Sequence, residues 1–343
     1  MMLRATAIPV LVTLLCVNST RAQTTPVILK VEIQNLIFYE VDTADSSKFG
    51  TNPNITPSGL SCNGPSFGGH LGNRVLGLGD IVAVNGQPAK GTYAVSGVTH
   101  CLSPTPVPGQ PIADTTHGPA VYETYEILQI DGTPVGTIMT NGLRVSAPSP
   151  PGLPAGTFNS AIVGGTGAFL GARGQTGNAN ANQVTVGGTN SRSITEDPAN
   201  RRLNGGLHAV FTLYVIPLSR PQIAMTPDGP AIVHSNDFSP VGNSKPAAPG
   251  EILSLFATGL GPTRPGVDPG QPFPADLLAV VNSPLQVTVN GEVAEVLGAV
   301  GLPGAVDGYR VNFRVPPEAA KGPATIQVSA AWIAGPFVSI PVQ

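Results

Sequence analysis

From Val27 onward, apolar and polar residues alternate in short segments that end at Gly, Pro or Asn. This period of two, interrupted by turn residues, is typical of antiparallel strands. Eight such segments precede residue 217, and that number suits a closed barrel, because closure removes exposed sheet edges. The expected strands cover residues 27–41, 80–85, 91–99, 120–130, 133–143, 158–163, 167–173 and 206–216.

Two dipeptides mark the sharpest turns in this part of the chain. Asp131-Gly132 joins two alternating segments, and we expect it to supply the positive φ angles of a type I′ hairpin turn. Asn85-Gly86 predicts a second tight turn.

A Pro-rich segment, residues 218–230, separates this region from the rest and is predicted to be a linker. We therefore expect a barrel domain over residues 23–217 and a second β domain over residues 231–343. In the second domain, residues 309–315 alternate strictly, which places Tyr309 and Phe313 on one face. About seven short strands in such a length predict an immunoglobulin-like sandwich. The clearest of them cover residues 251–257, 285–289, 292–297, 309–315, 325–328 and 337–342.

Composition supports an all-β chain with its own core. The 42 glycines and 36 prolines disfavour long helices, while 41% hydrophobic residues provide enough apolar surface to bury. Charged residues are only 11% and the formal net charge is −3, so we expect no nucleic-acid partner, since phosphate binding needs a basic surface.

The N-terminus predicts export. Arg4 precedes an apolar run over residues 5–17, and small residues follow at Thr20 and Ala22. This pattern is a secretory signal peptide over residues 1–22, cleaved after Ala22, and it predicts a secreted, extracellular protein. The apolar run is too short to span a membrane, and no later segment is long and apolar enough, so no membrane span is expected.

Two cysteines remain after the leader. Cys62 and Cys101 would meet an oxidising compartment, where a single disulfide is the natural interpretation, and two separately buried thiols are the alternative. Neither cysteine has a second Cys or His at a spacing typical of metal ligands, so no metal site is predicted.

Residues 162–174 read IVGGTGAFLGARG. This segment resembles the GGTGxFxxARG motif of dirigent proteins and allene oxide cyclases, and residues 37–42 and 208–213 add weaker support. The resemblance covers about residues 27–217. It implies an eight-stranded barrel, often in a homotrimer, with a lumen for a small apolar or aromatic molecule and no cofactor. The motif glycines are Gly164, Gly165, Gly167, Gly171 and Gly174.

A candidate ligand site follows from the side chains around this motif. If the strand is regular, Phe169 and Arg173 share a face, and Arg173 would bind a phenolate, carboxylate or oxyanion in the lumen. Alternatively, Arg173 forms a structural ion pair or a bulge turns it to solvent. Thr166 stands where active plant members often carry an acid, which is a departure from the motif. The candidate ligand-binding residues are Arg173, Phe169, Tyr39, Asp42, Tyr125 and His208.

Residues 249–262 look like the opening strand and turn of IPT/TIG-type Ig-like modules, and residues 287–294 and 309–316 add to the likeness. The likeness covers about residues 231–343. This stretch is particularly similar to a C-terminal domain of secreted bacterial proteins. The likeness implies a packing or interaction module, and in the binding-module hypothesis this domain contacts a cell surface or matrix.

Familiar catalytic motifs are absent from the sequence: it has no GxSxG, HExxH, P-loop or CxxC. Glu123 and Glu126 differ by three positions, so a strand places them on opposite faces and they make a poor carboxylate pair. Three hypotheses remain: a binding module, a cofactor-free isomerase or coupling guide, and a purely structural extracellular protein. The sequence favours the first and leaves catalytic residues unassigned.

Overall fold

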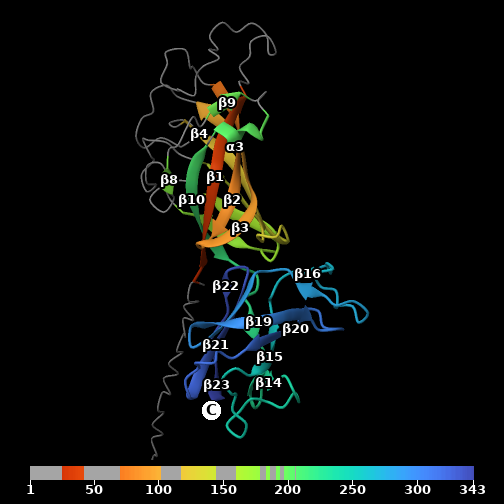
Figure 1. Ribbon diagram of the computed structural model, residues 1–343. Coiled ribbons are helices and arrows are strands. Elements are labelled where there is room, and N and C mark those ends of the chain that lie inside the picture. Colours follow the sequence, from red (N-terminus) through yellow and green to blue (C-terminus); the bar gives the residue numbers. More distant parts are fainter. Residues whose placement is uncertain are drawn as a thin grey trace, which may run out of the picture.

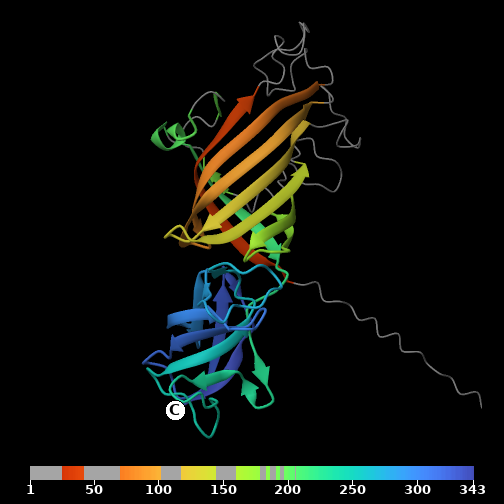
Figure 2. The ribbon, with the colours of Figure 1, turned by 90° about the vertical axis from the view of Figure 1, so that its right-hand side faces the viewer.

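The chain forms two β structures that lie end to end in the computed structural model (Figure 1). A view from the side shows the same arrangement, with steeply inclined barrel strands above the C-terminal sheet (Figure 2). The predicted leader, Asp42 and Cys62 lie outside the described residues, so the cleavage site and the disulfide stay predictions. The structure describes residues 25–41, 70–101, 117–143, 160–177, 183–185, 191–193, 197–204 and 206–343.

The first structure is a closed antiparallel barrel. Its strands pair in the order β1-β2-β3-β4-β5-β6-β7-β10, and β10 pairs back onto β1, with Leu29 opposite Leu213. This closure confirms the predicted eight-stranded barrel and the all-β class. The barrel strands are β1 (Val27–Val41), β2 (His70–Val84), β3 (Gln87–Cys101), β4 (His117–Leu128), β5 (Pro134–Leu143), β6 (Ala161–Gly167), β7 (Arg173–Thr176) and β10 (Leu207–Ile216).

Alternation along the strands creates the barrel core. On β10, Leu207, Ala209, Phe211, Leu213 and Val215 are buried because every second side chain points inward. Inward residues of β1 to β6 join them in one apolar cluster. Three short elements lie beside the barrel: β8 (Gln183–Thr185), β9 (Ser191–Ser193) and α3 (Asn200–Asn204).

Of the two predicted tight turns, one has the expected geometry and the other does not. Asn85 and Gly86 have φ angles of 50° and 75°, the pair of positive values that a type I′ turn requires. At the other hairpin only Gly132 is positive, at 90°, so the expected type I′ geometry at Asp131-Gly132 is wrong. Asp131 instead accepts hydrogen bonds from the Thr133 N–H at 2.9 Å and hydroxyl at 3.0 Å, which stabilises a wider turn.

The strand expected over residues 167–173 is also wrong. β6 ends at Gly167, residues 168–171 form a tight turn, and β7 begins only at Arg173. The physical reason is the backbone: Gly167 and Gly171 have φ angles of 60° and 70°, which a regular strand cannot contain.

The second structure is a curled sheet with an order of β11-β15-β20-β19-β18-β21-β22 and four further strands attached. The predicted alternation is confirmed, since Tyr309, Val311 and Phe313 are buried in its core. An immunoglobulin-like sandwich stays a prediction. The strands are β11 (Gln222–Ile223), β14 (Ile232–His234), β15 (Ile252–Thr258), β16 (Thr263–Arg264), β17 (Val280–Val281), β18 (Leu285–Val289), β19 (Glu292–Gly301), β20 (Tyr309–Arg314), β21 (Gly322–Ala330), β22 (Ile333–Ala334) and β23 (Val338–Val342).

The C-terminal sheet begins inside the segment expected to be a linker. β11 pairs with β15, and Ile223 is buried in the second core. The ribbon formed by β12 (Met225–Thr226) and β13 (Gly229–Pro230) follows directly. Within the described ranges, no helix is long and apolar enough to cross a membrane.

The two structures are joined by more than the chain connection. Ala331 and Ile333, at the turn between β21 and β22, belong to the apolar cluster of the barrel, and Trp332 packs against that cluster. Arg220 donates a hydrogen bond of 2.6 Å to the carbonyl of Thr25. The tip of this hairpin therefore contacts the base of the barrel.

Candidate functional site

A buried carboxylate lies inside the barrel. Glu123 on β4 shares its face with Val121, Tyr125 and Ile127, and its exposed fraction is only 3%. Its Oε1 accepts a hydrogen bond of 2.7 Å from the Tyr93 hydroxyl. Its Oε2 accepts one of 2.7 Å from the Thr140 hydroxyl. We call Glu123, Thr140 and the hydroxyl of Tyr93 the polar layer.

An aromatic cluster adjoins the polar layer on the side of the C-terminal domain. Tyr93 and Phe211 stack with their ring centroids 5.3 Å apart, and Tyr125 packs at a tilt 5.1 Å from Tyr93. All three rings are almost completely buried. Such aromatic pairs attract one another beyond their burial of apolar area, and the three rings belong to the apolar core of the barrel.

Two buried hydroxyl-bearing residues, Ser160 and Thr176, lie beside each other where β6 begins and β7 ends. Ser160 precedes β6, and its backbone N–H donates a hydrogen bond of 2.9 Å to Thr176 Oγ1. Ser160 Oγ is buried and has no hydrogen-bond partner among the described residues. Register places Ser160 on the same inward face as Ile162. The barrel interior thus carries polar side chains on several strands at a similar level.

Two of the six candidate ligand-binding residues lie inside the barrel. Tyr125 belongs to the aromatic cluster, and Phe169 is 1% exposed and packs into the same apolar core. Tyr39 lies on β1 among residues whose side chains are outside the described set, and Asp42 lies outside it entirely. The structure therefore brings Tyr125 and Phe169 together in one core.

The remaining two candidates lie on the outside. Arg173 is exposed and donates hydrogen bonds of 3.0 Å to the carbonyls of Val163 and Ala172, because the turn before β7 shifts the alternation. This is the solvent-facing alternative that the sequence left open. His208 faces away from the core, and its Nε2 lies 3.0 Å from Glu32 Oε1 on the outer surface of β1.

Most of the motif glycines allow neighbouring segments to approach closely at the base of the barrel. A Cβ on Gly165 would lie 2.4 Å from the Phe169 carbonyl oxygen, and one on Gly174 would lie 1.9 Å from that of Tyr214. Gly167 and Gly171 adopt positive φ angles at the turn. A Cβ on Gly164 would meet nothing within 4 Å, so this glycine alone is not required by contacts.

The sequence alone assigned no role to Glu123. It placed Glu123 and Glu126 on opposite faces, and the structure confirms that separation, with Glu123 buried and Glu126 exposed. The alternation of faces along β4 would have indicated its burial, because an acid on the same face as Val121, Tyr125 and Ile127 must point into the core. The same alternation places the Tyr122 side chain on the outer face, where it is 63% exposed.

The polar layer is a hydrogen-bonding cluster within an otherwise apolar barrel core. Burying a carboxylate is costly unless hydrogen bonds satisfy it, and the hydroxyls of Tyr93 and Thr140 do so at short distances. A carboxylate held in this way accepts a hydrogen bond from a hydroxyl or exchanges a proton with a bound molecule. Within the described residues, no group of three or more His, Cys, Asp or Glu side chains is placed to hold a metal ion.

Comparisons with known proteins add no family to this picture. No family model matches the chain, and no curated protein or solved structure matches it significantly. The resemblances to dirigent proteins, allene oxide cyclases and IPT/TIG modules accordingly rest on the residues quoted above and stay predictions.

Proposed function

We propose that the chain is an exported binding protein whose barrel holds a small apolar or aromatic molecule. The observation that carries the proposal is the burial of Glu123 with its two hydroxyl partners, Tyr93 and Thr140, inside the barrel. Stability alone favours apolar residues at such a position, because desolvating a carboxylate costs several kcal/mol. Few polar groups among apolar and aromatic walls are typical of small-molecule sites.

The polar layer indicates the chemistry of the ligand. The aromatic cluster and Phe169 offer apolar and ring surfaces, while Glu123 offers acceptor oxygens. An aromatic compound with a hydroxyl group would match both features, since its ring packs against apolar walls and its O–H donates to the carboxylate. A phenol is therefore the preferred probe.

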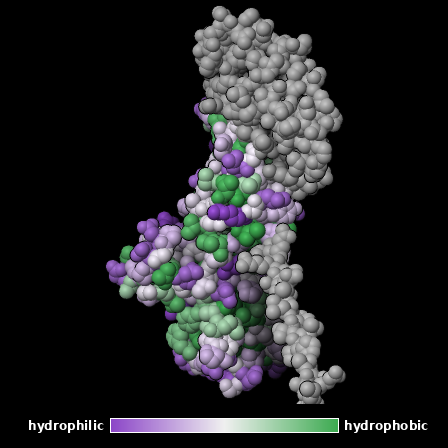
Figure 3. Space-filling model, turned by 180° about the vertical axis from the view of Figure 1, so that it is seen from behind, coloured by the Kyte–Doolittle hydropathy of each residue, from purple (hydrophilic) through white to green (hydrophobic). Residues whose placement is uncertain are grey.

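The C-terminal domain, in this proposal, provides contact with a cell surface or matrix. Leu277, Leu278 and Val280 are all exposed within one short segment, and Phe337 is 62% exposed. Apolar residues mix with polar ones over the face shown in Figure 3. Exposed apolar side chains that cluster are typical of interaction surfaces. A Leu277→Ser/Leu278→Ser variant should wash off host cells more readily than the unmodified chain if this segment makes the contact.

A cofactor-free isomerase is the second candidate, and one observation favours it. The carboxylate of Glu123 and the phenol of Tyr93 share a hydrogen bond and form a candidate acid and base pair. The other group invoked for catalysis, Arg173, lies on the outer surface, and this placement removes the cation expected to stabilise negative charge. Binding without turnover is therefore the preferred function.

The test begins with native mass spectrometry of the full chain purified from a secreting host. A small molecule released on denaturation, from a monomer or from the trimer that the barrel resemblance implies, would support the proposal. The next measurement compares 2-naphthol with naphthalene by fluorescence titration. We expect 2-naphthol to bind about tenfold more tightly and Glu123→Gln to reduce that preference. A chain that carries no molecule and binds neither compound would support a purely structural role instead.

A further inference from the structure

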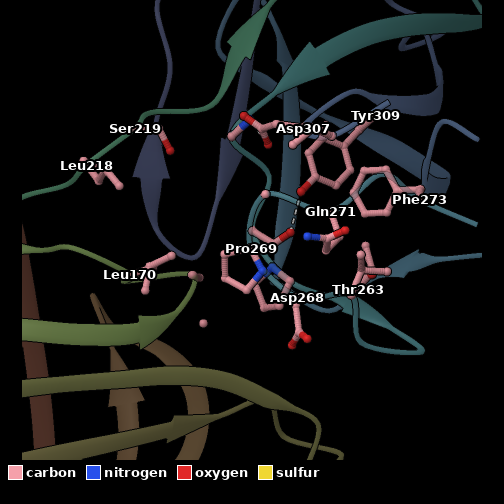
Figure 4. Close-up of a pocket in the computed structure, with 18 residues that line it drawn as sticks. Leu170, Leu218, Ser219, Thr263, Asp268, Pro269, Gln271, Phe273, Asp307 and Tyr309 are labelled. Carbon is pink, nitrogen blue, oxygen red and sulfur yellow. Dashed lines mark hydrogen bonds between the residues drawn. The ribbon is translucent and has the colours of Figure 1, made fainter. Parts of the chain in front are cut away.

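A cavity lies where the barrel meets the C-terminal domain. It has a volume of about 360 Å³. Leu170 and Leu218 line it from the barrel side, while Phe273 and Tyr309 line it from the C-terminal sheet, as Figure 4 shows. Its volume falls within the range of small-molecule sites, and a position between two domains is common for them.

An aromatic pair forms the far wall of this interdomain cavity. The rings of Phe273 and Tyr309 are 5.1 Å apart, edge to face, and both residues are buried. The Tyr309 hydroxyl donates a hydrogen bond of 2.6 Å to the carbonyl of Gly261, drawn as a dashed line in Figure 4. Burial and the nearby charge of Asp307 raise the pKa of Tyr309, so the phenol keeps its proton and the hydrogen bond persists at neutral pH.

Glycines bring the two domains close enough to form the cavity. Gly261 has a φ angle of 89°, and a Cβ at this position would lie 3.2 Å from the Cβ of Ala168 in the turn after β6. Gly259 has a φ angle of 72°, and its Cβ would lie 2.6 Å from the carbonyl oxygen of Arg220. A side chain at either position would force the neighbouring atoms to shift, so the close approach needs glycine.

The two charged residues that line the cavity are both acidic. Asp268 and Asp307 are exposed at its edge, and of the described residues that line it none is Lys, Arg or His. The Gly259 N–H donates to both oxygens of Asp307, at 3.1 and 3.2 Å, which holds that carboxylate in place. Arg220 lies next to the lining residue Ser219 in the chain, but its guanidinium donates to the carbonyl of Thr25. The charged side chains that line the cavity therefore favour a cation over an anion.

We propose that the interdomain cavity binds a small organic cation, in which an amine or quaternary ammonium group is attached to an apolar or aromatic body. The ammonium group would lie beside one of the two carboxylates, Asp268 or Asp307, which Figure 4 draws at opposite ends of the lining, and the body would contact Leu170, Leu218 and the aromatic wall. Attraction to two carboxylates favours a cation, and the electron-rich faces of Phe273 and Tyr309 add to it. An anion would meet only repulsion from these carboxylates. This site is independent of the function proposed for the barrel.

The experiment uses the full chain and two forms of one fluorescent probe. Dansylcadaverine carries a primary amine on an aromatic body, and its N-acetylated form has nearly the same shape without the charge. We expect the amine to bind about tenfold more tightly at low ionic strength, with the difference shrinking as salt is added. Equal affinities for the two probes, or no saturable binding of the amine, would overturn the proposal.

Variants then locate the probe. The double variant Asp268→Asn/Asp307→Asn should lower the affinity for the amine to that for the acetylated form. The amide oxygen introduced at position 307 can still accept from the Gly259 N–H, so the fold should persist, and a circular-dichroism melt checks this. Asp228→Asn removes an exposed acid in the turn between β12 and β13 and should leave binding unchanged. Loss of binding in Glu123→Gln but not in the double variant would place the amine in the barrel and overturn the assignment.

Discussion

The hydroxyl of Tyr93 donates a hydrogen bond of 2.7 Å to Glu123 across two adjacent barrel strands, β3 and β4. Both residues are almost completely buried. Because register places Val95, not Tyr93, directly opposite Glu123, the bond runs diagonally between neighbouring inward positions. It thereby joins the aromatic cluster to the polar layer.

Replacing this phenol should destabilise the barrel. Tyr93→Phe removes one donor from a buried carboxylate, so we expect the free energy of unfolding to fall by about 2 kcal/mol. Urea unfolding followed by circular dichroism measures the change. Tyr214→Phe is the matched control, since Tyr214 is only half-buried on the outer face of β10, and it should change stability by less than about 0.5 kcal/mol. Equal losses in the two variants would contradict a specific role for the bond.

Alternation allowed most strands to be predicted from the sequence. The barrel strand over residues 27–41 and the C-terminal strand over residues 285–289 have the predicted bounds, because their apolar residues recur with a period of two on faces that become buried. The other expected barrel strands are present with shifted ends, apart from that over residues 167–173. Tertiary contacts decide where such a strand stops, and alternation within one segment does not contain that information.

The candidate site was harder to predict because it depends on backbone geometry and on pairs of distant residues. Arg173 would share a face with Phe169 in a regular strand, but the turn with the positive φ angle of Gly171 intervenes, and the Arg173 side chain is exposed. The partners of Glu123 come from strands that only the fold brings together, so Tyr93 and Thr140 could not be assigned from spacing. Only the burial of Glu123 could have been predicted, because the alternation along β4 places its side chain in the barrel core.

The adjacent glycines of the motif should respond differently to the same substitution. Gly165→Ala would place a Cβ 2.4 Å from the Phe169 carbonyl oxygen and 2.6 Å from that of Thr137, so the backbone must shift. We expect a loss of about 2 kcal/mol or more. Gly164→Ala meets nothing within 4 Å and should be neutral or slightly stabilising, because Ala restricts the unfolded chain. Thermal unfolding of both variants tests this; a stability loss in Gly164→Ala equal to that in Gly165→Ala would refute the packing argument.

An ion cluster outside the barrel should make stability depend on pH. Asp80 on β2 accepts hydrogen bonds from Arg201 at 2.6 Å, from Arg202 at 2.7 and 2.9 Å, and from Asn35 at 3.0 Å. Burial alone would raise the pKa of Asp80, but the bonds from Arg202, Asn35 and Arg201 together lower it below its usual value. The carboxylate therefore attaches α3 to the barrel in its charged form.

A lowered pKa in the folded state means that the stabilisation is complete above the unfolded pKa of about 4 and is lost as the pH falls through the folded value. Asp80→Asn should lower the free energy of unfolding by about 2 kcal/mol at neutral pH and flatten its decline in acid. Denaturant unfolding from pH 7 to pH 3 measures both effects, with the exposed Asp228→Asn as the control. An unchanged acid profile in Asp80→Asn would show that other carboxylates govern the decline.

The turn between β21 and β22 should hold the two domains together. Ala331 and Trp332 have φ angles of 49° and 62°, a conformation that costs about 1 kcal/mol or more for residues other than glycine. The strain is offset because the turn brings Ala331, Trp332 and Ile333 against the apolar cluster of the barrel. Trp332→Ala keeps the unfavourable backbone and removes the largest of these contacts.

We therefore expect Trp332→Ala to destabilise the chain by about 2 kcal/mol and to separate the melting of the barrel from that of the C-terminal sheet. Differential scanning calorimetry should show a single transition in the unmodified chain and a broadened or double one in the variant. Phe337→Ala removes an exposed aromatic ring from the same domain and serves as the control.

Loss of the contact between Trp332 and the barrel should also widen the interdomain cavity. Trp332→Ala is therefore expected to weaken dansylcadaverine binding, although Trp332 does not line that cavity. A single sharp transition and unchanged probe binding in Trp332→Ala would mean that the hydrogen bonds and glycine contacts between the domains suffice to hold them together.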